Sequence, residues 1–408
     1  ALAVTYNPPW GSYQQLTLTF DSNPNLIHDL VLSQGLINWV TQGLFLGEHH
    51  TYFTPQVDDY FIDDAEWLPT TACGTNPDAT GAQYRINGAD LTSLINWQTT
   101  TQNQPLTSNF VLHMAFNGFG AQPGSYVNDD LTPATQANQA SFKWISHTFD
   151  HTNLDAITYA NASSEITQNN TAATTLGLTS FDVRNMVTPD ISGLTNPAFL
   201  QAAVDNGIRY LVTDTSRPGY NNPTPNTGIP NPLQPSILMI PRHPNNLFFN
   251  VSTPNEWAAE YGCIYPQLAY AYPQILDNIS DTFLVNMLRG DIDPEMFHQP
   301  NLRAYDGTHS LLGDLIDLTF SKYGNLVTFP VLSPTQDTIG AKMSSRALYD
   351  TAGVTGSFIA HQRVMITATQ AATVPVTGLP SPSAENYGGQ TISHVSVAAG
   401  QTVTMPLP

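Results

Sequence analysis

The sequence feature that most constrains the fold is an alternation between short apolar segments and longer segments with helical spacing. The apolar segments have the composition of β-strands and lie at residues 51–57, 110–116, 142–146, 182–188, 209–213, 237–241, 295–298 and 325–329. Strands that are separated by helices pair in parallel, because each helix carries the chain back to the edge of the sheet where the strands begin. The alternation therefore predicts an α/β fold with a parallel sheet or a barrel.

Local signals mark helices between these strands. Asn196 and Pro197 form a helix start signal, and Gly207 ends the same segment. Leucines repeat at helical spacing from Leu311 onward and the repeat stops at Gly324.

Both ends of the chain fall outside this alternation. Residues 1–43 predict one strand at 15–20 and one helix at 26–40, too little for a domain, so we expect them to pack on the barrel or to be the stub of a removed module. Residues 351–408 are rich in β-branched side chains, which predicts a small β-rich C-terminal appendage. The barrel then occupies residues 44–350.

One long connection stands out within the barrel. Residues 218–235 are rich in proline, asparagine and glycine. Long loops inside compact domains often carry function. We therefore expect this loop to rim a cleft.

The charge balance is strongly acidic but sparse. The 408 residues include 12 Lys or Arg and 32 Asp or Glu, for a net charge of −20, and charged residues make up 11% of the chain against 41% hydrophobic residues. The hydrophobic share predicts a globular chain. The shortage of basic residues argues against nucleic acid as a partner. An acidic surface of this kind suits a secreted protein that works at mildly acidic pH or meets a cationic polymer.

Export also fits the remaining bulk features. No apolar run approaches the length of a membrane span, and the chain starts at Ala1 without a signal-peptide pattern, so we expect a processed or trimmed start. Cys73 and Cys263 are the two cysteines. In an exported chain one long-range disulfide is more common than two free thiols, so we predict that they are joined.

Two carboxylates close the first strand-like segment, in the run Val57-Asp58-Asp59-Tyr60. In such a pair one carboxylate can coordinate a cation while the other, whose pKa the shared charge displaces, stays free to take a proton. The common alternative is a solvated turn. Asp63-Asp64 just downstream shows how easily a pair of this kind arises.

A second run, His147-Thr148-Phe149-Asp150-His151, closes the segment 142–146. If this run is a helical turn, the i, i+4 spacing places both imidazoles on one face, from which two neutral nitrogens reach the same divalent ion. A surface turn is the alternative. Both runs follow strand ends, where α/β barrels carry their catalytic residues. We therefore predict a metal site of Asp59, His147 and His151 with an open position for water.

The order of these features resembles that of the NodB-type polysaccharide deacetylases. Asp-Asp is followed by His-x-x-x-His, a proline-containing strand end, a strand that ends in Asp, and a late histidine. The surrounding sequence is most similar to the secreted galactosaminogalactan deacetylases of carbohydrate esterase family eighteen, through Gly43-Leu44-Phe45-Leu46-Gly47 and Met296-Phe297-His298-Gln299-Pro300-Asn301. The resemblance covers about residues 36–350. It implies a distorted (β/α) barrel that removes N-acetyl groups from amino-sugar polymers.

The resemblance also implies roles for single residues. It makes Asp58 the general base, His298 the general acid, and Asp214 the carboxylate that tunes the acid histidine; the metal ligands are the three named above. The family's Arg-x-Pro motif falls on Val187-Thr188-Pro189-Asp190, which has no arginine. In those enzymes the arginine orients the base, so we expect Arg184 or another group to hold it, and we interpret Arg217-Pro218-Gly219 as a coincidental match.

The chemistry of amide hydrolysis asks for these residue types. A divalent metal acts as a Lewis acid, so that a carboxylate suffices as base. A backbone N–H, here that of Tyr60, would hold the oxyanion. A histidine that titrates near ~6.5 can protonate the leaving amine. We further predict that Tyr60, Asn117, Asp190 and Asn301 bind the substrate.

The other histidines receive more ordinary predictions. His113 lies in an apolar strand, so we predict a buried structural histidine. His49 and His50 alternate just before the first strand, and one of them is a weaker candidate for the cleft.

Taken together, the sequence predicts a secreted polysaccharide N-deacetylase that acts on an acetylated hexosamine polymer with zinc or another divalent metal. Two alternatives stay open. One is a carbohydrate-binding protein on a catalytically decayed esterase barrel, which the missing arginine favours. The other is a glycoside hydrolase that uses Asp58 together with a distant acid.

Overall fold

A parallel sheet forms the centre of the computed structural model, which describes residues 3–11, 13–359 and 362–407. Four strands pair side by side in the order β13 (Glu295–His298), β5 (Pro55–Tyr60), β8 (His113–Phe116) and β9 (Lys143–Ser146). β10 (Tyr210–Val212) and β12 (Leu238–Ile240) form a second parallel pair, and β11 (Ile229–Pro230) lies antiparallel beside β12.

Single parallel bridges join the two groups of strands into a ring. They link Ser146 to Met186, Asn185 to Tyr210, and His243 to Glu295. The predicted barrel is therefore confirmed, and because three of its joints are single bridges rather than full ladders, the barrel is distorted.

The predicted strands take part in the barrel, except for the segment 325–329. The segment 182–188 enters only through the bridges at Asn185 and Met186. The predicted strand at 325–329 is wrong, because Asn325 caps α8 (Leu311–Gly324) and its N–H bonds back to the carbonyl of Ser321. The chain pairs again only at β14 (Val331–Leu332), which runs parallel to β4 (Thr51–Tyr52).

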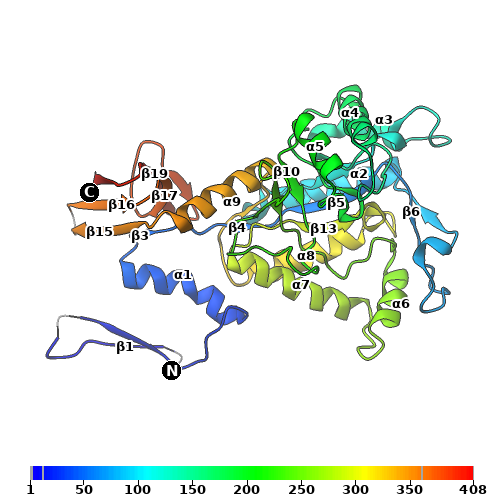
Figure 1. Ribbon diagram of the computed structural model, residues 1–408. Coiled ribbons are helices and arrows are strands. Elements are labelled where there is room, and N and C mark those ends of the chain that lie inside the picture. Colours follow the sequence, from blue (N-terminus) through cyan, green and yellow to red (C-terminus); the bar gives the residue numbers. More distant parts are fainter. Residues whose placement is uncertain (1–2, 12, 360–361, 408) are drawn as a thin grey trace.

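Helices lie around the ring, except that the first of them lies outside it, toward the N-terminal strands (Figure 1). They are α1 (Ile27–Thr41), α2 (Gly88–Gln102), α3 (Leu131–Asn138), α4 (Tyr159–Leu176), α5 (Pro197–Asp205), α6 (Pro254–Ile264), α7 (Tyr272–Arg289), α8 and α9 (Gln336–Thr351). The predicted start of α5 is confirmed, since the Asn196 side chain accepts a hydrogen bond from the N–H of Ala198.

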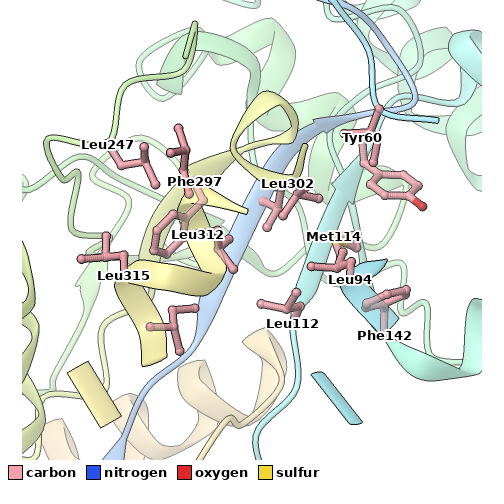
Figure 2. Close-up of a cluster of buried hydrophobic side chains, with 14 of the residues drawn as sticks. Tyr60, Leu94, Leu112, Met114, Phe142, Leu247, Phe297, Leu302, Leu312 and Leu315 are labelled. Carbon is pink, nitrogen blue, oxygen red and sulfur yellow. The ribbon is translucent and has the colours of Figure 1, made fainter. Parts of the chain in front are cut away.

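The main core lies between the sheet and the helices α2 and α8. Met114 of β8 and Phe297 of β13 are fully buried there, and Leu94, Leu312 and Leu315 cover them from the two helices (Figure 2). Each such side chain contributes about 1.5–3 kcal/mol when it leaves water. This packing fixes the strands whose ends carry the polar residues described below.

The two ends of the chain form smaller units. β1 (Ala3–Tyr6) and β2 (Gln15–Leu18) make a hairpin ahead of α1, which contacts α7. The C-terminal part is rich in β-strands, as predicted, and forms two antiparallel sheets: β15 (Thr355–Ile359), β16 (Arg363–Ala368) and β20 (Gln401–Pro406), then β18 (Glu385–Tyr387), β19 (Gln390–Val397), β17 (Ala372–Thr377) and β3 (Phe45–Leu46). The domain boundaries at 43/44 and 350/351 stay a prediction, although β3 pairs with β17 across the second of them.

Two further predictions can be compared with the structure. Cys73 and Cys263 form a disulfide, as predicted, and it ties the loop between β6 (Asp64–Ala65) and β7 (Gln83–Tyr84) to α6. Among the described residues, no helix has the length and apolar character that a membrane span needs.

Candidate active site

A cleft of about 780 Å³ opens at the carboxyl ends of the central strands. Its wall includes Asp58, Asp59, His147, His151, Arg242 and His298. The structure therefore brings together the two predicted motifs and the predicted acid histidine.

Asp58 and Asp59 both face the cleft because the strand that carries them is irregular. In a regular strand, successive side chains point to opposite faces. Here the pairing of β5 with β8 shifts between Val57 and Tyr60, and Asp59 has a φ of 64°, in the left-handed region. Such bulges re-aim side chains and are frequent next to active sites.

Asp58 is held by a buried arginine. Nη1 and Nη2 of Arg242 donate to the two carboxylate oxygens of Asp58 at 2.8 and 2.7 Å. The side chains of Arg242 and Asp58 are 1% and 5% exposed. Burial alone would raise the pKa of Asp58, but Arg242, with His147 and His298, holds it below its ordinary value. Asp58 is thus charged and fixed in orientation, as a base must be.

Arg242 is the functional residue that the sequence analysis missed. It directly follows the predicted strand segment 237–241, and this place at a strand end is the one signal of it in the sequence. Arg184 does not reach the cleft, since it pairs with Asp182 and Asp337 on the surface. Arg217 does line the cleft, although its sequence motif is coincidental: its Nη2 donates to the carbonyl of Asp190 at 3.1 Å.

Asp59, His147 and His151 converge in the geometry of a metal site. The Nε2 atoms of His147 and His151 lie 3.3 and 3.1 Å from Oδ1 of Asp59. A tetrahedral ion with bonds of about 2.0–2.1 Å separates its ligand atoms by about 3.3 Å. Oδ1 of Asp59 is buried and has no hydrogen-bond partner of suitable geometry among the described residues. The three residues therefore fit a divalent metal ion.

The predicted helical turn at 147–151 is wrong, although its two histidines do converge. The segment is irregular, with Thr148 and His151 at φ values of 63° and 65°. Nδ1 of His147 lies 2.9 Å from the carbonyl of Val187, which leaves Nε2 for the cleft. Oε2 of Glu165 accepts hydrogen bonds from the N–H groups of Phe149 and Asp150, both at 3.0 Å.

His298 lies beside the carboxylates because β13 pairs with β5. The register places His298 directly opposite Asp58. Burial lowers the pKa of His298 below its ordinary value, against the attraction of Asp58 and Asp59. The expectation of a pKa near ~6.5, drawn from an average histidine, is therefore too high.

A comparison with known protein families identifies the family of this chain. The model of the Agd3 deacetylase domain matches residues 128–356, more than half of the chain. The chain belongs to the Agd3 deacetylase family. The matched residues include His147, His151, Arg242 and His298, whereas Asp58 and Asp59 precede the match. The resemblance drawn from the sequence is confirmed, and the protein is a deacetylase.

The crystal structure of Agd3 supports the fold of this Agd3 family member. The crystal structure of Agd3, described as a novel carbohydrate deacetylase, matches with a TM-score of 0.85 and 22% identity over 99% of this chain and 72% of its own. A family 4 carbohydrate esterase from Streptomyces lividans in complex with acetate has a TM-score of 0.34 and 12% identity over 71% and 94%. A putative polysaccharide deacetylase from Mycobacterium smegmatis has 0.43 and 11% over 75% and 94%. No curated protein matches.

Of the remaining predicted site residues of this family member, two line the cleft and three do not. Asp190 and Asp214 line the cleft. The carboxylate of Asp214, however, binds Ser216 and Arg217, and no contact among the described residues joins it to His298. The charges that act on His298 come from Asp58, Asp59, Arg242 and His147, so the predicted tuning by Asp214 finds no support.

Three side chains predicted to bind substrate are buried away from the cleft. The hydroxyl of Tyr60 bonds to that of Thr135, and its ring packs in the core. Asn117 donates to the carbonyl of Thr148 at 3.2 Å, and Asn301 donates to the carbonyls of Phe248 and Val251. These side chains shape the backbone around the site instead. The oxyanion role of the Tyr60 N–H stays a prediction.

The other histidines lie away from the cleft. His113 is fully buried, and burial lowers its pKa to about 3, which confirms that it is a core histidine. Neither ring nitrogen has a hydrogen-bond partner of suitable geometry among the described residues, so a satisfied histidine is not confirmed. His50 pairs with Glu385 at 2.9 Å and the ring of His49 packs on Phe329, so neither approaches the site.

Proposed function

We propose that the protein is a secreted, metal-dependent N-deacetylase that hydrolyses acetamide groups on an acetylated amino-sugar polymer. One observation carries this proposal. Asp58, charged and held by two hydrogen bonds from Arg242, lies in the same cleft as three side chains that converge as metal ligands would. The structural likeness to Agd3, a carbohydrate deacetylase, supports a carbohydrate substrate. The disulfide supports an oxidising, extracellular location.

Asp59, His147 and His151 would hold the metal ion. One carboxylate and two imidazoles with their Nε2 atoms free are a donor set that suits zinc. When bound, the ion would supply Lewis acidity towards the acetyl oxygen and the attacking water.

The chain's own residues account for the proton transfers. Asp58 takes a proton from the attacking water, since Arg242 keeps the carboxylate charged and aimed at the cleft. The leaving amine nitrogen needs a proton when the C–N bond breaks. His298 is the donor that the register places opposite Asp58. Because its pKa is lowered, His298 is neutral in the free enzyme at neutral pH. It therefore takes the proton that Asp58, directly opposite, removed from the water, and passes that proton to the amine nitrogen.

The two alternatives lose their support in this geometry. The decayed esterase rested on a missing arginine, and Arg242 supplies the guanidinium from another strand. A glycoside hydrolase would not need the ligand cluster beside Asp58. A deacetylase explains both features with one reaction.

Acetate release tests the proposal directly. The protein, incubated with acetylated hexosamine oligomers, should release acetate without shortening them. A chelator should abolish the release, and added Zn²⁺ should restore it. Shortened oligomers without acetate, or undiminished release after complete metal removal, would overturn the proposal.

A further inference from the structure

A second cluster of possible metal ligands lies beside the arginine that holds the base. His243 follows Arg242 directly, and Asp291 and Asp293 precede β13. The donor atoms of these three side chains lie within 4.8 Å of one another. None of them lines the active-site cleft.

The distances in this cluster suit metal coordination better than hydrogen bonding. Nε2 of His243 lies 3.5 Å from Oδ2 of Asp291 and 3.6 Å from Oδ2 of Asp293. Hydrogen bonds from nitrogen to oxygen end near about 3.2 Å, whereas ligands around a tetrahedral ion with bonds of about 2.0–2.1 Å are about 3.3 Å apart.

The two ring nitrogens of His243 differ in their partners. Nε2 of His243 is buried and has no hydrogen-bond partner among the described residues. Nδ1 of the same ring lies 3.1 Å from the hydroxyl of Thr215, which fixes the ring and directs Nε2 towards the two aspartates. Such a partner on the second ring nitrogen is the usual companion of a metal-bound histidine.

Charge also favours a cation here. Glu295, 3% exposed, adds a third carboxylate next to the cluster, and Asp293 has a side-chain exposure of 3%. Across the described ranges, the only ion pairs to these three carboxylates come from His243. Buried carboxylates that outnumber their cationic partners must be neutralised by protons or by a bound cation.

The backbone of the folded chain positions the carboxylates of the cluster beside His243. In Asp291-Ile292-Asp293-Pro294-Glu295 the acidic residues alternate, so an extended chain directs them to one side. His243 donates its N–H to the carbonyl of Pro294 at 2.8 Å and accepts one from Met296 at 2.9 Å. The side chain of Asn222, from the long loop at 218–235, donates to both oxygens of Asp293.

We propose that His243, Asp291 and Asp293 form a second binding site for a divalent transition-metal ion such as Zn²⁺. An imidazole with two carboxylates suits such an ion, while Ca²⁺ and Mg²⁺ prefer oxygen ligands throughout. A bound ion joins the end of β12 to the start of β13. Arg242 follows β12 and His298 ends β13, so the site braces both.

Metal stoichiometry tests this proposal independently of the active site. The folded, metal-free chain is loaded with Zn²⁺, desalted and analysed for zinc per chain. We expect two zinc ions in the original chain, one in His147→Ala, one in Asp293→Asn, and none in the double variant. Circular dichroism verifies that each variant is folded, and His243→Gln replaces Asp293→Asn if the latter fails to fold.

A matched control is the surface pair of His309 and Asp306, which is hydrogen-bonded at 2.8 Å. His309→Gln should retain two zinc ions. A folded His147→Ala variant that retains no zinc overturns the second site, and so does an Asp293→Asn variant that still binds two. Loss of deacetylation in His147→Ala alone bears only on the proposed function.

Discussion

The contact between Asp58 and Arg242 decides, at the scale of single residues, what the carboxylate can do. A buried carboxylate without a partner would take up a proton and lose its use as a base. The two hydrogen bonds of 2.8 and 2.7 Å keep it charged and fix its plane. The guanidinium is therefore a positioning group, and its shape matters as much as its charge.

Replacing Arg242 by lysine separates shape from charge. Lysine keeps the positive charge but cannot donate two parallel hydrogen bonds to one carboxylate. We expect Arg242→Lys to retain its zinc and to lower kcat by about 10²-fold, the usual cost of a displaced catalytic group. Steady-state kinetics and zinc analysis measure both quantities. Arg184→Lys is the matched control, since Arg184 binds two aspartates on the surface and its replacement should leave kcat unchanged. A kcat close to that of the original chain in Arg242→Lys would contradict the positioning role.

His298 has a separate prediction, because its proton is needed only by a poor leaving group. His298→Ala should keep its zinc and its KM but lose kcat on an N-acetylated oligomer, by about 10²- to 10⁴-fold. An aryl acetate leaves more easily and needs less protonation, so the loss on that ester should be much smaller. Kinetics on the two substrates compare the losses. An equal loss on both, or a loss of zinc, would mean that His298 is a ligand or a structural residue.

At the scale of strands and loops, the sequence predicted where the strands lie better than the backbone conformation and the neighbours of the residues that follow them. Strands lie within the apolar segments predicted at 110–116, 209–213 and 295–298. These strands could be predicted because a buried strand is recognised by its local apolar composition. The loop at 147–151 was mispredicted as a helical turn, since an i, i+4 spacing does not determine φ, and Thr148 takes a positive value. Arg242 was missed because only the closure of the ring brings β12 near Asp58.

α6 carries a buried acid whose titration can be followed through stability. Glu260 is 5% exposed; Asn250 donates to Oε1 at 3.1 Å, and Oε2 has no partner among the described residues. Burial raises the pKa of Glu260 to about 7 from 4.5. The unfolded chain therefore loses this proton at lower pH than the folded chain does. Stability should fall as the pH rises between these two values.

Glu260→Gln removes that titration. We expect the variant to match the original chain near about pH 4 and to be more stable near about pH 8, because it carries no charge to bury. Thermal unfolding across this range measures the difference. Asp182→Asn serves as control, since the hydrogen bond from Arg184 holds the pKa of Asp182 below its ordinary value and the guanidinium stays charged throughout this range. A difference that stays constant with pH would contradict the prediction.

For the whole molecule, the alternation of strands and helices was enough to predict the barrel, and the cysteine count was enough to predict the disulfide. The disulfide spans 190 residues, from Cys73 to Cys263. The sequence could not show that Phe45–Leu46 pairs with β17, because that pairing joins segments more than 300 residues apart in sequence.

Reduction of the disulfide should destabilise the protein. In the chain-entropy model, closing a loop of this length contributes roughly 4–5 kcal/mol. We expect a clearly lower Tm in the presence of a reductant, measured by calorimetry. The double variant Cys73→Ser/Cys263→Ser should reproduce the lower Tm and be insensitive to the reductant. Cysteines that are free to alkylation in the native, unreduced protein would contradict the assignment.

In the proposed mechanism, a metal and a carboxylate base share one cleft but have separate roles. Acetate release by a zinc-loaded Asp58→Asn variant tests this most directly. Asparagine keeps the size of the side chain but cannot take a proton, so the variant should bind its active-site zinc and release acetate from acetylated hexosamine oligomers about 10²- to 10⁴-fold more slowly. A zinc-loaded Asp58→Asn variant that releases acetate at nearly the original rate would contradict the account.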